Sequence, residues 1–136
     1  MVVVTNAKNA NRRRRLSKIP KKHGRSFHHR RPRHVPGLVL AEVDYWRHKP
    51  DLGAAWLVFL EDVEAGIWRV EWPTAGDLRR ARQLQVTYAD SALGVVDASV
   101  IALVERLLEP KVATLDRRHF SFVRPAHIPA LRLLPE

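Results

Sequence analysis

The chain has 136 residues, which is enough for one compact domain and too few for two ordinary ones. It has no cysteine, so disulfide frameworks and thiolate metal sites are excluded, and no apolar run approaches the roughly 20 residues that span a bilayer. The net charge of +10 originates in residues 1–36, which hold 12 of the 24 Lys and Arg residues and none of the 14 Asp and Glu residues. We therefore expect a soluble, cytoplasmic protein with a nearly neutral body.

The first 36 residues predict a basic arm. Residues 1–4, "MVVV", form an apolar, β-branched run that predicts a short buried strand. From Lys8 to Pro36 no apolar period of 2 or 3.6 residues appears, so most of this segment is expected to be disordered. Its cations could bind nucleic-acid phosphates, although a non-specific, solvated polyelectrolyte is the simpler interpretation. The chain thus divides into an arm with a remnant first strand (1–36) and a folded body (37–136).

The body predicts alternating helices and strands. Thr74 and Asp77 predict a capping box at the start of one helix, and Gly66 predicts the end of another. The predicted apolar sides consist of Ala54, Leu57, Val58 and Phe59 in one helix and Leu78, Ala81, Leu84 and Tyr88 in the next. The predicted elements are helices over 37–46, 51–66, 75–90 and 97–108, the last a core helix, and strands over 67–72, 111–116 and 131–135. This order predicts an α/β fold with a mainly parallel sheet.

Three carboxylates of the body have apolar neighbours. Glu42 lies within "LVLAEVDYW", Asp97 begins the predicted core helix, and Asp116 follows the apolar run "VATL". Ligands of parallel α/β proteins bind at the carboxyl edge of the sheet, and a buried carboxylate needs a partner, a proton or a metal ion. Because no Ser/His/Asp or Cys/His set is evident, these acids favour a hard cation, Mg²⁺ or Mn²⁺, and phosphodiester hydrolysis.

Each acid also has a simpler interpretation. Asp97 is typical of a helix N-cap, Asp116 of a residue that opens a turn, and Glu42 of a solvated or arginine-paired side chain. In the same turn, Arg117 and Arg118 either contact a substrate phosphate or are solvated. His119 is expected to be structural rather than catalytic.

The stretches "LVLAEVDYW", "YADSALGVVDASVIALVERL" and "VATLDRRHFSFVRP" together resemble the VapC-type toxins, the PIN-domain ribonucleases of bacterial type II toxin–antitoxin systems. The spacings support the resemblance, with 55 residues from Glu42 to Asp97 and 19 from Asp97 to Asp116. It implies a PIN-like three-layer α/β/α fold in which these residues are the second, third and fourth acids of a site for Mg²⁺ or Mn²⁺. It also implies an RNA substrate, a cognate VapB-type antitoxin, a homodimer and no membrane association.

The first strand departs from the family pattern. In the family an Asp follows the first apolar run, whereas "VVVTN" lacks it, and Thr5 and Asn6 match the two residues after that Asp. The basic arm replaces the family's first helix, so this strand–helix unit is expected to be degenerate or disordered. One hypothesis is a disrupted reading frame, which an intact alternative frame encoding an Asp and an apolar helix would support.

Two functions are therefore expected as alternatives. The first is a metal-dependent endoribonuclease that binds its cation through Glu42, Asp97 and Asp116. The residues expected on the substrate side are Thr5, Asn6 and Arg117. The second is a catalytically impaired PIN-fold relic that binds an antitoxin or RNA. Since the loss of one of four carboxylates weakens cation binding, we expect low or absent nuclease activity.

Overall fold

The computed structural model describes residues 2–3, 33–46 and 53–135. These residues contain a five-stranded sheet in the order β3-β2-β1-β4-β5, and all neighbouring strands are parallel. The strands are β1 (Val2–Val3), β2 (Arg33–Pro36), β3 (Trp68–Glu71), β4 (Lys111–Ala113) and β5 (Arg132–Leu134). The predicted α/β fold with a parallel sheet is therefore confirmed.

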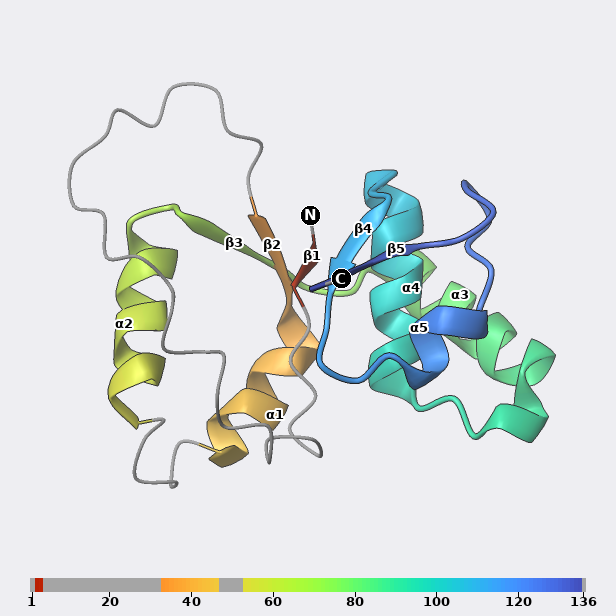
Figure 1. Ribbon diagram of the computed structural model, residues 1–136, viewed down its shortest axis with the longest axis horizontal. Helices are drawn as coiled ribbons and strands as arrows, with labels where there is room; N and C mark the ends of the chain where they lie inside the picture. The colour runs from red at the N-terminus through yellow and green to blue at the C-terminus, as the bar shows by residue number, and fades with distance from the viewer. Residues whose placement is uncertain (1, 4–32, 47–52, 136) are drawn as a thin grey trace.

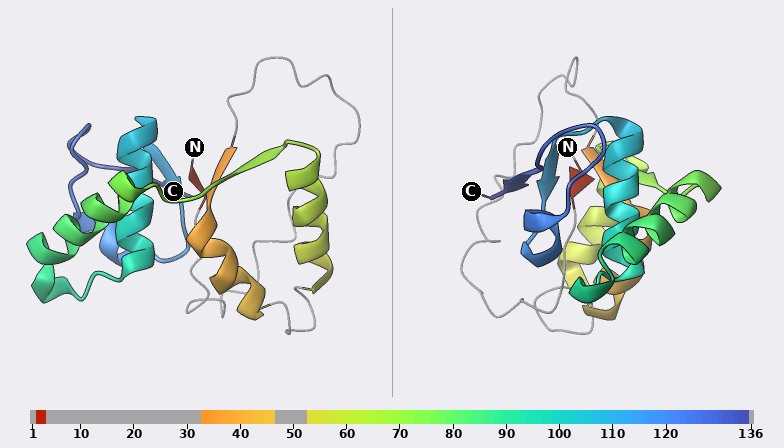
Figure 2. Two further views of the ribbon diagram at one scale, coloured as in Figure 1. Left: turned by 180° about the vertical axis from the view of Figure 1, so that it is seen from behind. Right: turned by 90° about the vertical axis from the view of Figure 1, so that its right-hand side faces the viewer.

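The described helices lie beside this sheet and at its carboxyl edge. They are α1 (Gly37–Trp46), α2 (Gly53–Glu64), α3 (Ala75–Thr87), the short 3₁₀ helix η3 (Ala89–Ser91), α4 (Val95–Leu107) and α5 (Arg118–Phe122). Figure 1 shows α3, α4 and α5 near β4 and β5, whereas α2 lies beside β3, and Figure 2 shows the same separation from behind. The helix α1, the start of α4 and α5 all lie at the carboxyl edge of the sheet (Figure 1).

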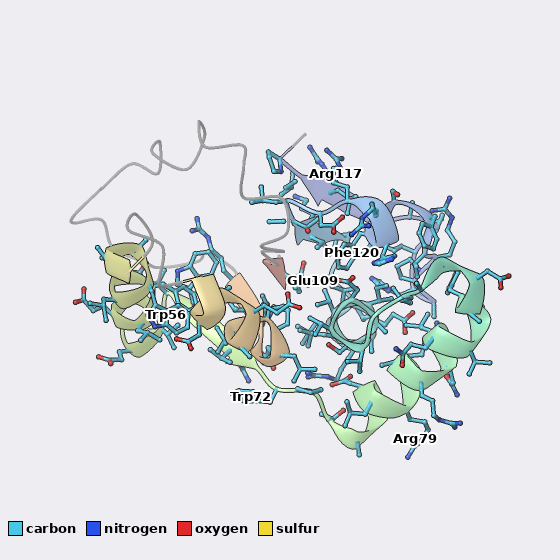
Figure 3. The ribbon with its side chains drawn as sticks, turned by 90° about the horizontal axis from the view of Figure 1, so that it is seen from below. Trp56, Trp72, Arg79, Glu109, Arg117 and Phe120 are labelled. Atoms are coloured by element: carbon cyan, nitrogen blue, oxygen red, sulfur yellow. The ribbon has the colours of Figure 1, made fainter. Side chains whose placement is uncertain are left out.

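The core forms around α4. Seven consecutive residues of this helix, Ala98–Val104, are buried, as its apolar character on all sides predicts. Val2 of β1 and Val112 of β4 are fully buried beside them, and Phe120 of α5, labelled in Figure 3, is 2% exposed. Burial of such side chains stabilises the fold by about 1.5–3 kcal/mol each relative to exposure.

The strand β2 lies within the segment whose charge predicts a basic arm. Its residues pair with β1 on one side and with β3 on the other, and His34, Val35 and Pro36 are buried. A four-residue strand with a single aliphatic side chain is too short for a pattern of period 2 to be recognised. The expectation of an irregular chain up to residue 36 is therefore wrong for these four residues.

Two predicted apolar helix sides are more exposed than expected. No described residue of α2 is buried, and Leu57 and Val58 are 61% and 55% exposed. In α3, Ala81 and Leu84 are buried and the C-cap Tyr88 packs against the core as expected, but Leu78 is 48% exposed. The cause for α2 is its place at the sheet's end, where the described rings of Trp56, Phe59 and Trp68 pack mainly on one another.

The predicted capping box at α3 is confirmed, and it belongs to an ionic network. The Asp77 amide donates to Thr74 Oγ1 at 3.1 Å, and the Thr74 amide donates to Asp77 Oδ2 at 2.8 Å. Arg106 of α4 donates through Nε to the same carboxylate at 3.0 Å and lies 3.7 Å from Glu71 of β3. Because Asp77 is only 3% exposed, this network holds α3 against α4 with a compensated buried charge.

Candidate active site

A cavity of about 190 Å³ lies at the carboxyl edge of the sheet, where α1, α4 and α5 meet. Its charged and polar lining residues are Glu42 of α1, Asp97 of α4, and Arg118 and His119 of α5. The remaining wall comes from Ala92, Gly94, Val95 and Val96, just before and at the start of α4. The structure thus brings Glu42 and Asp97 together although they are 55 residues apart in the chain.

Asp97 faces a histidine of α5. It belongs to the first turn of α4, whose N-cap is Gly94, so the alternative interpretation of Asp97 as an N-cap is wrong. Its Oδ2 lies 2.7 Å from Nδ1 of His119, and Nε2 of the same ring lies 3.3 Å from the carbonyl oxygen of Ser91. A left-handed backbone conformation at Ala92 (φ 51°) ends the turn that presents this carbonyl. The imidazole is therefore held between α4 and that turn.

Asp116 is oriented by its own turn. It is 4% exposed, its amide donates to Thr114 Oγ1 at 3.2 Å, and the Thr114 hydroxyl donates to its carbonyl at 2.9 Å. The Arg118 amide donates to Asp116 Oδ1 at 3.1 Å, so the turn that the simpler interpretation predicts is present. This turn aims the carboxylate at α5.

Arg118 neutralises the Asp116 carboxylate. Its Nε donates to Oδ1 at 3.3 Å and its Nη2 to Oδ2 at 3.0 Å, a two-pronged arrangement that fixes both groups. These hydrogen bonds hold the pKa of Asp116 below its ordinary value of 3.8, although burial acts in the opposite direction. Asp116 is therefore linked to the cavity by its pairing with Arg118, which is one of the lining residues. The Arg118 side chain is 69% exposed.

Arg117, one of the predicted substrate residues, is absent from the cavity lining. Arg117 donates through Nη1 to the carbonyl oxygen of Pro135 at 3.1 Å, and its neighbour Arg118 lines the cavity instead. Thr5 and Asn6 lie outside the residues that the structure describes. His119, expected to be structural, contacts Asp97 and lines the cavity. Its place three residues after Asp116, at the start of a short helix, was the signal in the sequence.

The donor chemistry of the cavity partly suits a hard cation. Glu42 and Asp97 both line the cavity, and their carboxylate oxygens are the kind of ligand that Mg²⁺ and Mn²⁺ prefer. Asp116 can become a third ligand only if Arg118 turns away from it, and Asp97 already contacts His119. Within the described part of the chain, no three carboxylate or histidine side chains are arranged to hold a metal ion together.

Comparison with known proteins identifies a relative. No protein-family model matches the chain. Over 91 residues it is 33% identical to ribonuclease VapC26 of Mycobacterium tuberculosis (strain ATCC 25618 / H37Rv), and this match covers 67% of each chain. In residues 2–3, 33–46 and 53–135, no helix combines the length and the apolar character that a membrane crossing needs. With this degree of identity over two thirds of both proteins, the chain belongs to the VapC family of ribonucleases.

Proposed function

We propose that the chain is the toxin of a type II toxin–antitoxin system and acts as a metal-dependent endoribonuclease of PIN type, with a three-layer α/β/α arrangement. The observation that carries this proposal is the cavity at the carboxyl edge of the sheet. Glu42 and Asp97 both line it, and Asp116 is hydrogen-bonded to Arg118, which also lines it. The relative that shares 33% identity is named as a ribonuclease, which supports RNA as the substrate.

Glu42, Asp97 and Asp116 are the residues that would hold Mg²⁺ or Mn²⁺. When bound, the cation would supply charge neutralisation at a phosphodiester and a more acidic water. His119 keeps the Asp97 carboxylate in place through its 2.7 Å contact, and Ser91 fixes the opposite side of the ring. Arg118, with an exposed guanidinium beside the cavity, would contact an oxygen of the RNA phosphate once it leaves Asp116.

The test is RNA cleavage with Mg²⁺ or Mn²⁺ by the parent chain and by Asp97→Asn and Glu42→Gln. Both substitutions keep the shape of the side chain and remove a negative charge, so each should reduce cleavage and weaken Mn²⁺ binding measured by calorimetry. Glu61→Gln, at an exposed position of α2, is the matched control and should change neither. Cleavage that survives Asp97→Asn would remove the carboxylate site from the mechanism.

A second candidate function has its own observations. The first strand lacks the family's Asp, and both Asp97 and Asp116 are already engaged by side chains of α5. These features favour a catalytically impaired protein that retains the fold and binds an antitoxin or RNA. Insertion of an Asp between Val4 and Thr5 distinguishes the two functions. If the site is a four-carboxylate site, the insertion should strengthen Mn²⁺ binding and raise cleavage, and an unchanged affinity would show that the alignment of the first strand is wrong.

Partners follow from the family. We propose that a VapB-type antitoxin binds the chain and that the chain pairs with a second copy of itself. The exposed Leu57 and Val58 on α2 supply apolar surface that suits a protein partner. Co-expression with a candidate VapB-type antitoxin, followed by measurement of the mass of the purified complex, tests both partners at once.

A further inference from the structure

We propose that Phe122 is a stacking platform for one unpaired base of the RNA, next to the cavity that holds the carboxylates. This inference rests on the proposed function, because it names how the same site recognises its substrate. It begins from Phe122 at the end of α5, a residue that is 38% exposed.

The Phe122 ring is held in place by two other rings. Its centroid lies 5.9 Å from that of His119 at an interplanar angle of 83°, and 5.8 Å from that of Tyr88 at 58°. The Tyr88 ring is tilted and the His119 ring is nearly perpendicular to Phe122, so both contacts restrict the orientation of the Phe122 ring. The Tyr88 hydroxyl accepts a hydrogen bond from the Arg124 amide at 3.1 Å, which holds the Tyr88 ring in place beside Phe122. Rigid aromatic surfaces bind bases at a low entropic cost.

His119 joins this platform to the carboxylates. The same imidazole contacts the Phe122 ring on one side and Asp97 Oδ2 on the other. A phosphate in the cavity would therefore place an adjoining nucleotide within reach of the Phe122 ring. A base that is paired in a duplex cannot offer its face to a side chain, so the platform requires an unpaired base.

Cations flank the ring along the chain. Arg118 precedes Phe122 by four residues, which places both on the same face of α5, and its side chain is 69% exposed. Arg124 follows and donates through Nη1 to the carbonyl oxygen of Ser121 at 3.2 Å, so its guanidinium stays beside α5. Arginines that flank an aromatic residue in the chain suit a nucleotide, whose base can stack and whose phosphates bind cations. This charge pattern favours RNA over an apolar protein segment.

The test measures binding without cleavage. A fluorescent single-stranded oligoribonucleotide of about ten nucleotides is compared with an abasic oligonucleotide of equal length and charge, by anisotropy in EDTA. We expect Phe122→Leu to weaken binding of the base-bearing oligonucleotide by about 5- to 150-fold and to leave the abasic one unchanged. Phe59→Leu, which alters a ring on α2 at the other end of the sheet, should affect neither (Figure 1).

A second variant keeps the ring and reports on stacking directly. In Phe122→Trp, the base-bearing oligonucleotide should quench indole fluorescence beyond the quenching seen in the parent chain, and the abasic one should not. Equal quenching by both oligonucleotides, or equal binding of both by the parent and Phe122→Leu, would overturn the platform. A shift from dimer to monomer in Phe122→Leu with unchanged RNA binding would also overturn it and assign the ring to a protein interface.

The outcomes separate this inference from the proposed function. Because EDTA removes the cation, base-dependent binding can be present in a chain that cleaves nothing, and the endoribonuclease proposal would then fail alone. Conversely, cleavage that depends on Asp97 together with binding that ignores the bases would reject the platform and retain the nuclease.

Discussion

At the scale of residues, the site is defined by the side chain that each carboxylate contacts. Asp116 is paired with Arg118 and Asp97 contacts His119, so α5 provides a partner for two of the proposed metal ligands. The proposed divalent cation would compete with Arg118 for Asp116. An Arg118 side chain displaced in this way would be available to the proposed substrate.

We predict that Arg118→Gln strengthens Mn²⁺ binding by about tenfold, because it removes a positive charge that holds Asp116. Calorimetric titration with Mn²⁺ measures the change. Arg117→Gln is the matched control, since the neighbouring guanidinium donates to the Pro135 carbonyl and should leave the affinity unchanged. An equal change in both variants would mean that general charge, and not the Asp116 pair, sets the affinity.

The same pair makes the stability of the metal-free protein depend on pH. The pKa of Asp116 is lowered in the folded state, so the pair stabilises the fold above the ordinary carboxyl pKa and loses this contribution as pH falls through the folded value. Denaturant unfolding from about pH 6 to about pH 2 should show a steeper loss of stability in the parent than in Arg118→Gln. Parallel pH profiles would show that the ion pair contributes nothing to stability.

At the scale of elements, the start of α1 is the most constrained junction. Gly37, the first residue of α1, is buried beneath the indole of Trp72, which follows β3. A Cβ atom at Gly37 would lie 2.6 Å from Cδ2 and 2.8 Å from Cζ3 of that ring. Since α1 carries Glu42, this close approach also determines how the first described acid reaches the cavity.

We predict that Gly37→Ala lowers the free energy of unfolding by about 1 kcal/mol, at the low end for overpacking because the exposed indole can shift. Gly76→Ala, in the first turn of α3, is the control and should raise it by roughly 0.5 kcal/mol, since its Cβ meets only Thr74 Oγ1 at 3.5 Å. Chemical denaturation followed by circular dichroism compares the two. Stabilisation by both substitutions would contradict the described packing of Trp72.

The elements also show what the sequence could predict. The apolar run of α4 and the Thr74 capping box are local signals, and both identify their helices correctly. The strand β2 is held by its neighbours on both sides, and its four residues carry no such signal. The position of Glu42 and Asp97 on one cavity follows from the parallel sheet. The pairing of Arg118 with Asp116 depends on side-chain geometry in a turn, and the pattern of apolar residues does not predict it.

At the scale of the whole molecule, the charge is divided between two regions. The first 36 residues hold no acidic residue, and the rest of the chain holds 14 acidic and 12 basic ones. We therefore expect the first region to supply non-specific attraction to the proposed RNA substrate, and the acids and arginines around the cavity to form the proposed specific site.

We predict that replacing Arg12, Arg13, Arg14 and Arg15 with Gln makes RNA binding less sensitive to salt, because fewer phosphates are neutralised. The slope of log affinity against log salt should become shallower by about 0.7 for each phosphate that the arm no longer neutralises. Anisotropy titrations at several salt concentrations give this slope. The control is Arg79→Gln with Arg82→Gln, two exposed positions of α3, where Figure 3 shows Arg79 pointing outward. A larger change in the control would place the non-specific binding on the body.

The position of β1 in the middle of the sheet has a consequence for the order of synthesis. Val2 pairs with His34 of β2 on one side and with Val112 of β4 on the other. The central strand β1 can therefore pair on both sides only after β4 has left the ribosome. Contacts between such distant parts of a chain form slowly, because a long loop must close first. The carboxyl edge of the sheet, with the cavity on it, is therefore assembled only after translation has passed β4. A ribosome-bound nascent chain that ends before β4 should thus carry no completed form of the proposed site.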